Sequence, residues 1–572
     1  MKILRVNMEN QTSSWEDVPE KWKLLGGRGL SAKILLDEVD PTCDPLGPGN
    51  KLIFAPGLLT GHRLSSLDRI SIGGKSPLTG GIKEANAGGS TGYHLAKLGI
   101  KALIIEEQPA DEEWQVLFIS KKEVQFLEGE KYYGMGVYQT AHLLVEEHSD
   151  QCAMALIGPG GEMELRAAGI QNLDKDFVPS RIAARGGLGA VMGSKRVKAI
   201  VIDSSEGEKP PIADQAAFRE ARNAYTKSLM DHPQTQTYRD YGTASMTNMT
   251  NHFGCLPTRG FSAGTFESAE KISGEQLRDT LLDRGGESKT SHACMPGCTI
   301  QCSNVFGGED GKTLVSPLEY ETIGLMGSNL GIDDLDTIAR LNLEMNDQGL
   351  DTIEIGSALG VAAQAGHFNW GDGDRIFELI SEIRAGTPLG RVLGNGASIT
   401  GQVLGVERVP AVKGQAMPAY DPRTLKGTGV TYATSPQGAD HTCGLTIRTH
   451  VKHTDPKGQV DISRSGQISM AGYDTLGVCI FAGSGFAAAP DTISSLLNAR
   501  YGWEVDEDVL QKLGGECLRL EREFNRRAGF TQKDDRLPEW MTLEPLPPLN
   551  SVFDVDDDEM DTIFDFLDDH EV

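Results

Sequence analysis

Three cysteines stand close together in the segment CMPGCTIQC, at positions Cys294, Cys298 and Cys302. The whole chain has nine cysteines in 572 residues, so this clustering is not the pattern of scattered buried thiols. A spacing of four would place the thiols on one face of a helix, but Pro296 and Gly297 disfavour a helix interior by about 3 and about 1 kcal/mol. The segment is therefore predicted to be a loop, which can wrap around a metal.

Two kinds of metal site use thiolates in this way. A structural zinc ion takes four ligands in a tetrahedron, and an iron–sulfur cluster is held by four thiolates. Either site needs a fourth ligand from elsewhere in the chain. Cys517 lies in a helical pattern and is predicted to belong to the core, and spacing does not choose among the others. The cysteines outside the segment are Cys43, Cys152, Cys255, Cys443, Cys479 and Cys517.

The charge balance excludes two classes of partner. The chain has 54 basic and 81 acidic residues and a net charge of −27. Nucleic acids and anionic membranes need a basic face, so neither is an expected partner. The N-terminal residues lack the apolar stretch of a secretory signal, and the odd, uneven set of cysteines is not a disulfide framework. A cytoplasmic protein is expected.

The pattern of elements predicts an α+β fold with three domains. A β-sheet-rich domain is expected over residues 1–210, followed by two mainly α-helical domains over 211–409 and 410–572. The β-like runs cover residues 2–7, 51–57, 68–74, 101–107, 114–120, 123–129, 152–158 and 197–203. Helical periodicity covers residues 213–232, 334–351, 374–386 and 508–529. The acidic tail, residues 554–572, carries several apolar side chains and is predicted to be either solvated or docked as an amphipathic segment.

Many short strings along the chain occur together in one known family. They include GGRGLSAKILLDEV, FAPGLLTG, KSPLTGG, ANAGG and ARGGLGAVMGSKRVKAI, and later EYETIGLMGSNLGI, NDQGLDTIEIG, PAYDPR, TYATSPQGADH and DTLGVC. Each is weak alone, but their shared order over most of the chain is specific. The sequence resembles the tungsten-containing aldehyde:ferredoxin oxidoreductase family. The resemblance implies a tungsten bis-pyranopterin, with molybdenum as the alternative metal, a [4Fe–4S] cluster, and a Mg²⁺ ion that bridges the pterin phosphates.

In that family, two motifs of the form D-x-x-G-L-(C/D) embrace the two pterins. The second motif matches Asp474 to Cys479, with Val478 at the fifth position. The resemblance implies that Cys479 is the distant cluster ligand, beside Cys294, Cys298 and Cys302. The family spaces its first two loop cysteines by two residues, whereas three residues separate Cys294 from Cys298 here. A loop that contains glycine can absorb the additional residue.

The first pterin motif matches Asn346, Leu350 and Asp351. Asn346 stands where the family pattern has Asp, so one charge is lost, although an amide can still donate to and accept from a pterin edge. Gly349 in the same segment is also typical of a helix C-terminus.

The phosphates of the cofactor need local donors in so acidic a chain. By resemblance, Arg185 and Gly186 lie near the pterin phosphates, and Asn86 contributes to the Mg²⁺ site through its backbone. Backbone N–H groups in glycine-rich turns before helices suit this task. Arg69, seventeen residues before Asn86, matches the family arginine between the cluster and a pterin, where a guanidinium would neutralise cluster charge.

Two further side chains match family residues near the tungsten. Glu321 would shuttle protons, a task suited to a carboxyl whose pKa burial raises. His441 would hydrogen-bond the carbonyl oxygen of the substrate and polarise it. Glu319, two residues earlier, is the competing carboxylate.

The resemblance implies an enzyme that interconverts aldehydes and carboxylic acids. The chain has a single cluster motif, so electrons are expected to leave to ferredoxin or to an iron–sulfur partner subunit. Arg340 stands where some family members have a glutamate ligand of an interface iron, which is expected to be absent, so homodimer and hetero-oligomer both stay open. The alternatives are the catalytic subunit of an aromatic acyl-CoA reductase of the same family, and a non-catalytic zinc-binding protein.

Overall fold

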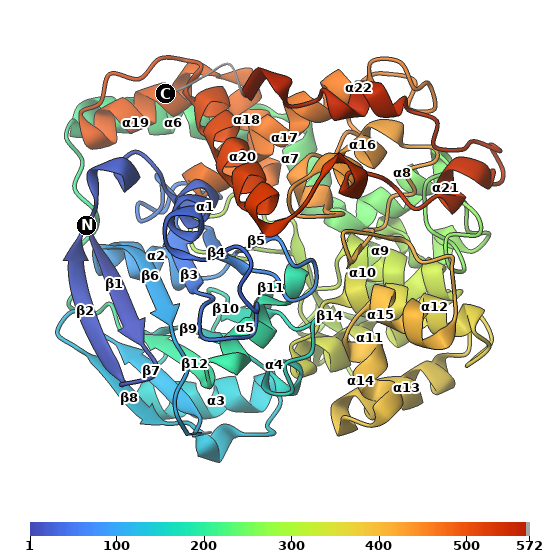
Figure 1. The fold of residues 1–572 in the computed structure, drawn as a ribbon, viewed down its shortest axis with the longest axis horizontal. Coiled ribbons are helices and arrows are strands. Elements are labelled where there is room, and N and C mark those ends of the chain that lie inside the picture. The colour runs from blue at the N-terminus through green and yellow to red at the C-terminus, as the bar shows by residue number, and fades with distance from the viewer. Residues whose placement is uncertain (112, 568–572) are drawn as a thin grey trace.

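The computed structural model describes residues 1–111 and 113–567. It confirms the α+β class, because two large sheets lie in the first 202 residues and mainly helices follow. Figure 1 shows the sheets on one side of the molecule, the helices α11 to α15 on the other, and α17 and α20 across the top. The boundaries predicted at residues 210 and 409 stay predictions.

The first sheet has the strand order β2-β1-β6-β3-β4-β5, with β1 parallel to β6 and all other neighbours antiparallel. It positions much of the site described below, since β4 and β5 form one edge. Its strands are β1 (Lys2–Asn7), β2 (Thr12–Asp17), β3 (Leu52–Pro56), β4 (Ile70–Lys75), β5 (Ile82–Ala87) and β6 (Ile100–Glu106).

The second sheet has the order β11-β10-β9-β12-β7-β8, with β7 parallel to β12. One hydrophobic cluster contains buried side chains of both sheets, so the two sheets share a core. The strands are β7 (Gln115–Ile119), β8 (Val124–Glu128), β9 (Ala153–Leu156), β10 (Ile170–Leu173), β11 (Pro179–Ala183) and β12 (Val197–Ile202). The helices of this part are α1 (Gly27–Glu38), α2 (Thr91–Lys97), α3 (Val137–His148), α4 (Pro159–Glu162) and α5 (Leu188–Ser194).

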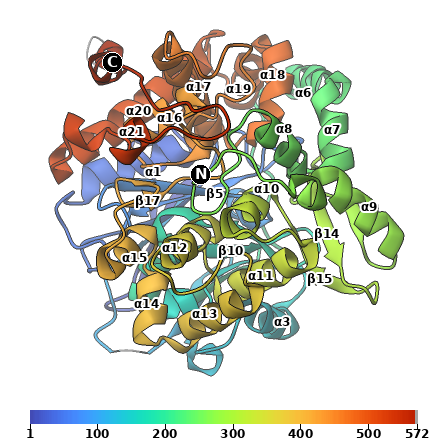
Figure 2. The ribbon, with the colours of Figure 1, turned by 90° about the vertical axis from the view of Figure 1, so that its right-hand side faces the viewer.

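The middle of the chain is mainly helical and includes one small antiparallel sheet. The sheet consists of β13 (Lys289–His292), β14 (Ser303–Gly307) and β15 (Thr313–Val315). The helices are α6 (Gln215–Asp231), α7 (Pro233–Tyr241), α8 (Met246–His252), α9 (Gly274–Arg284), α10 (Tyr320–Thr322), α11 (Leu335–Gln348), α12 (Thr352–Gln364), α13 (Gly373–Ala385), α14 (Pro388–Gly394) and α15 (Ala397–Leu404). Figure 2 shows α11 to α15 gathered on the lower half of that face, with α16, α17 and α20 above them.

The last part begins with a two-stranded ribbon, β16 (Ala411–Val412) and β17 (Gln415–Ala416). Its helices are α16 (Lys426–Thr434), α17 (Gln459–Leu476), α18 (Gly483–Ala488), α19 (Asp491–Tyr501), α20 (Val509–Ala528), α21 (Trp540–Leu543) and α22 (Asp557–Asp561). Met560, Ile563, Phe564 and Leu567 are buried, so the apolar side of the acidic tail is docked as far as residue 567. Residues 568–572 of the predicted tail lie outside the described residues.

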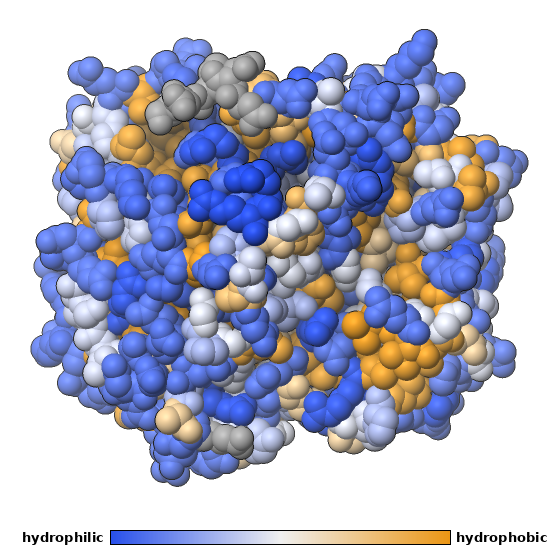
Figure 3. Space-filling view, viewed as in Figure 1, coloured by the Kyte–Doolittle hydropathy of each residue, from blue (hydrophilic) through white to orange (hydrophobic). Residues whose placement is uncertain are grey.

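The surface is mostly hydrophilic, but Figure 3 shows an apolar patch on one face near α12 and α15. Val403 of α15 is one of the most exposed large apolar side chains, at 59%. Among the described residues, no helix has the length and apolarity that crossing a lipid bilayer requires.

A buried ion pair fastens the last part of the chain to the first. Arg28 of α1 donates from Nε and one terminal nitrogen to both carboxylate oxygens of Glu521 of α20, each at 2.8 Å. Both side chains are 1% exposed. Figure 1 shows α20 passing over α1 at this point.

Replacing Glu521 by alanine is expected to lower the free energy of unfolding by about 3–5 kcal/mol, because the buried Arg28 charge loses its two short bonds to Glu521 and keeps only the longer contact with Asp474 at 3.3 Å. Glu516→Ala on the same helix is the matched control, since it removes a pair with Arg519 that is partly open to solvent and worth about 1 kcal/mol or less. Urea denaturation of both variants measures the difference. Equal shifts in the two midpoints would contradict a structural role for the buried pair.

Candidate active site

The cysteine segment is a loop, as its sequence predicts. It joins β13 to β14 without helical structure between Ala293 and Gln301. Gly297 has a φ of +83° and lies against the backbone of Arg63, where a side chain would be strained. The Thr299 N–H donates to Ser65 Oγ at 3.1 Å, which fastens the loop to the segment between β3 and β4.

Cys479, from the C-terminal part of the chain, contacts the same segment between β3 and β4 as the cysteine loop does. Its backbone N–H donates to the Ser66 carbonyl at 2.9 Å, and Ser66 Oγ lies 3.3 Å from Cys298 Sγ. Each of the four predicted thiols affects the ionisation of another. A hydrogen bond from Cys294 lowers the pKa of Cys298 to about 6, whereas burial raises the pKa of Cys302 and of Cys479.

A cavity of about 270 Å³ lies between Cys294, Cys302 and Cys479. Across residues 1–111 and 113–567, no three thiol, imidazole or carboxylate groups converge closely enough to hold one metal ion. An iron–sulfur cluster is larger than a single ion and takes one thiolate on each of its irons. Cys294, Cys302 and Cys479 line the cavity and Cys298 is hydrogen-bonded to Cys294, an arrangement that fits such a cluster.

The second pterin motif ends helix α17. Gly477 caps the helix with a φ of +82°, and the Val478 N–H donates to the Tyr473 carbonyl at 2.9 Å. The helix end docks on the loop after β3, where the Leu58 N–H donates to Thr475 O at 3.2 Å. Val478 is fully buried, whereas Asp474 and Cys479 line a cavity of about 300 Å³.

The first motif joins α11 to α12. Gly349 caps α11 with a φ of +69°. The segment is therefore a helix C-terminus, as Gly349 indicated, and the first motif lies in the same turn. Asp351 is the N-cap of α12 and accepts from the Ile353 N–H at 2.9 Å. Asn346, Leu350 and Asp351 all line the cavity of about 270 Å³ that contains the cysteines.

Arg185 and Gly186 lie in the tight turn that leads into α5. The Arg185 guanidinium donates to the carbonyls of Ala439 and Ala416 at 2.8 and 2.6 Å and lies 3.3 Å from Asp351. Gly186 has a φ of +79°, and a side chain there would clash with Lys83. Arg185 lines the larger of the two cavities.

Arg69, the residue directly before β4, and Asn86 of β5 are neighbours. The Arg69 guanidinium donates to the Asn86 side-chain oxygen and, at 3.2 Å, to its carbonyl. Both residues line both cavities, as does Cys479. The pair therefore lies between the cysteine cavity and the cavity that contains the two predicted catalytic side chains.

Glu321 and His441 face each other in the cavity of about 300 Å³. Glu321 Oε2 accepts from the Ala419 N–H at 2.9 Å, and Glu321 Oε1 lies 3.6 Å from His441 Nε2. In the described part of the chain, neither Glu321 Oε1 nor His441 Nδ1 has a hydrogen-bond partner. A carboxylate oxygen and an imidazole without partners can both bind a ligand at this point.

The structure also brings in charged residues that the sequence did not single out. Lys83 of β5 is fully buried and donates to Asp440 at 2.7 Å and to Gln437 at 3.0 Å. Burial opposes the charge on Asp440, but Lys83 and Arg185 hold the pKa of that carboxyl well below its usual range. Asp474 was already singled out as part of the second motif, and burial and Glu84 raise the pKa of its carboxyl to about 8. Their positions in the sequence could have indicated that Lys83 and Asp440 belong to the site, since Lys83 lies just before ANAGG and Asp440 directly before His441.

Comparison with known proteins places this geometry in a family. The profile described as "Aldehyde ferredoxin oxidoreductase, N-terminal domain" matches residues 3–204, and the profile for "domains 2 & 3" matches residues 220–564. The chain belongs to the aldehyde ferredoxin oxidoreductase family. It is 34% identical to the tungsten-containing aldehyde ferredoxin oxidoreductase of Pyrococcus horikoshii, over 96% of this chain and 92% of that protein.

Two further proteins are similar to this chain. The chain is 29% identical to the WOR-like subunit of an aliphatic sulfonate oxidoreductase of Pyrococcus furiosus, over 93% of this chain and 87% of that protein. The BamBC active site complex of benzoyl coenzyme A reductase, solved with 1,5-dienoyl-CoA, has the same fold. That likeness has a TM-score of 0.80 and 20% identity, and it covers 99% of this chain and 94% of the other.

Proposed function

We propose that this chain is a tungsten bis-pyranopterin oxidoreductase that interconverts aldehydes and carboxylic acids, with molybdenum as the alternative metal. It passes electrons through a [4Fe–4S] cluster to ferredoxin or to an iron–sulfur partner subunit. The observation that carries the proposal is the pair Glu321 and His441, 3.6 Å apart in a cavity that Cys479 also lines. The proposed domains are residues 1–210, 211–409 and 410–572.

The residues that would hold the cofactors surround the two cavities. Cys294, Cys298, Cys302 and Cys479 would bind the cluster. The pterins would lie against the two motifs, and the phosphates and Mg²⁺ against the backbone near Gly186, Arg185 and Asn86. The pterin contacts would come from Asn346, Leu350, Asp351, Asp474 and Val478. Arg69, bonded to Asn86, would lie between the cluster and a pterin, where its charge offsets theirs.

The protein side chains would handle the protons and the orientation of the substrate. Oxidation of an aldehyde to a carboxylic acid consumes water and releases two electrons and two protons. The bound metal and cluster supply the redox chemistry and accept the electrons. Glu321 Oε1, which has no partner in the described residues, is placed to accept a proton, and His441 Nε2 to donate a hydrogen bond to the substrate carbonyl.

Metal analysis combined with an activity screen tests this proposal. We expect tungsten or molybdenum with about four irons per chain, and reduction of a viologen dye by short aliphatic and aromatic aldehydes. Zinc without tungsten or molybdenum would contradict the proposal and favour the non-catalytic alternative. Benzoyl-CoA with a reduced viologen is the control, because turnover of that thioester in place of aldehydes would favour the acyl-CoA reductase.

A further inference from the structure

Arg448 is a cation without an anionic partner in the wall of the proposed active site. It lies in the loop between the His441–Cys443 turn and α17. None of the described carboxylates lies within 4.0 Å of its guanidinium, whose one hydrogen bond is a weak contact with Met246 Sδ at 3.9 Å. The guanidinium lies 5.1 Å from the ring centre of Tyr238 and 5.9 Å from that of Phe481. Burial lowers the pKa of Arg448 to about 10, which leaves it charged at neutral pH.

Arg448 lines two cavities at once. One is the cavity of about 300 Å³ that contains Glu321 and His441. The other is an outer cavity of about 650 Å³, bounded by the loop of residues 447–453 and by α8. Met249, Phe253 and Val451 of the outer cavity are 38–40% exposed, so this cavity opens at the surface. Arg448 therefore stands between solvent and the proposed catalytic pair.

The outer cavity has the opposite charge to the rest of the chain. The net charge is −27, yet the residues that line this cavity include Arg448 and Lys452 and no aspartate or glutamate. Lys452 is exposed and forms no ion pair with the described residues. A passage lined by charge of one sign raises the local concentration of ligands of the other sign. Small anions are therefore favoured in this outer cavity.

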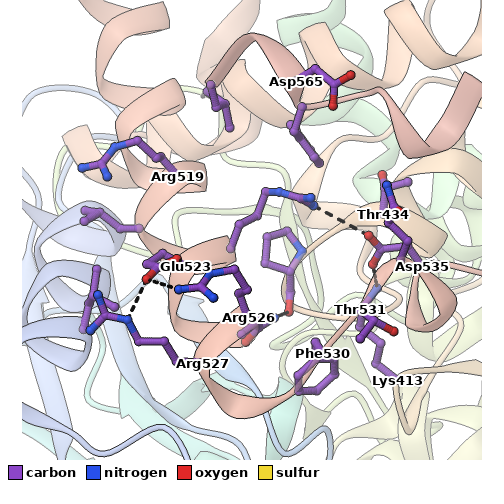
Figure 4. Close-up of a pocket in the computed structure, with 18 of the residues that line it drawn as sticks. Lys413, Thr434, Arg519, Glu523, Arg526, Arg527, Phe530, Thr531, Asp535 and Asp565 are labelled. Carbon is purple, nitrogen blue, oxygen red and sulfur yellow. Dashed lines mark hydrogen bonds and ion pairs between the residues drawn. The ribbon is translucent and has the colours of Figure 1, made fainter. Parts of the chain in front are cut away.

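Another large cavity does not have this property, although it is also rich in basic residues. It has a volume of about 1030 Å³ and lies against α20 (Figure 4). Glu523 accepts from Arg526 and Arg527 there, each at 2.7 Å, and Asp535 pairs with Lys413 at 2.7 Å. Each of these three cations has a carboxylate partner in the same wall, whereas Arg448 has none among the described residues.

We propose that the substrates are aldehydes that carry a second, anionic group, and that Arg448 is the residue that selects them. The proposal rests on the proposed function and adds the substrate class to it. The aldehyde end would meet Glu321 and His441, while the carboxylate or phosphate at the other end would accept hydrogen bonds from the Arg448 guanidinium. Leu445, Met470 and Phe481 line the same cavity and would contact the apolar carbons between the two ends.

The test compares succinic semialdehyde and glyceraldehyde 3-phosphate with neutral butanal, using the cofactor-loaded enzyme. We expect a higher kcat/KM for at least one anionic aldehyde than for butanal. Arg448→Met should lower that preference by about 10-fold to 100-fold, the range of a hydrogen bond to a charged group, and Arg448→Lys should have an intermediate effect. The matched control is Arg222→Met, which removes the same charge from an exposed position on α6 outside both cavities.

A second measurement does not depend on turnover. Succinate should raise the melting temperature of the wild-type protein, and Arg448→Met should lose this shift while Arg222→Met keeps it. Equal kcat/KM values for anionic and neutral aldehydes, or a preference and a succinate shift that survive in Arg448→Met, would overturn the proposal. If no aldehyde is oxidised at all, the proposed function fails, and a succinate shift that depends on Arg448 still identifies an anion site.

Discussion

Replacing Cys479 by alanine is expected to remove or convert the iron–sulfur cluster and to lower aldehyde oxidation to the background rate. Cys479 is the one proposed ligand that lies outside the loop of Cys294, Cys298 and Cys302, so its loss leaves a thiolate missing on one iron. An electron path through the cluster would then be interrupted. Iron content per chain, the visible absorption of the cluster and its EPR signal measure the outcome.

Cys255→Ala is the control for this prediction. Cys255 is also a buried cysteine, but it lines neither of the two cavities of the proposed site. We expect it to keep both iron and activity. If Cys479→Ala retained the full iron content and an unchanged EPR signal, the fourth ligand would have to be another residue, and the proposed contact between the cluster and the second pterin motif would be wrong.

The helices and strands could be predicted where apolar residues face the core and polar residues face solvent. Residues 213–232 and 508–529 are helical within a few residues of the predicted limits, as α6 and α20, because their apolar side chains recur at the helical period and face a core. The β-like runs of alternating or continuous apolar residues are strands β1, β3, β4, β6, β7, β8, β9 and β12.

Strand β5 was missed for a reason that belongs to the site. Its sequence, IKEANA, contains Lys83, Glu84 and Asn86, which read as a polar surface segment, yet its side chains are nearly all buried. Their burial is possible because they bond to Asp440, Asn86 and Arg69 rather than to water. Glu84 and Asn86 line the cavity of about 300 Å³ that we propose for the cofactor, so this strand breaks the usual polarity rule, and such exceptions are expected at functional sites.

The site itself could be assembled from the sequence only through family resemblance. Glu321 and His441 are far apart in the chain, and neither residue type nor spacing indicates that they meet. Arg448 shows the limit of this approach, because nothing near it in sequence marks it as an arginine without a carboxylate partner. That property depends on which side chains the fold brings within 4.0 Å of its guanidinium.

Replacing Glu321 by glutamine is expected to lower kcat for aldehyde oxidation by about 10²-fold to 10⁴-fold, the usual contribution of a general acid or base. The amide has nearly the same shape but does not accept a proton at neutral pH. Since the bond from the Ala419 N–H can persist to the amide oxygen, the fold and the cofactor content should not change. Viologen reduction under saturating aldehyde, with tungsten and iron measured on the same sample, tests the prediction.

Glu319→Gln is the matched control, because Glu319 lines the same two cavities and lies two residues away. Its oxygens already accept hydrogen bonds from Thr243 and, at 3.2 Å, from Ser303, whereas Glu321 Oε1 has no partner in the described residues. A carboxylate with both oxygens engaged is a poorer proton acceptor for a ligand, so Glu319→Gln should lower kcat by less than about 10-fold. If the order of the two effects were reversed, the proton acceptor would be Glu319, and Glu321 would serve only to hold the Ala419 backbone.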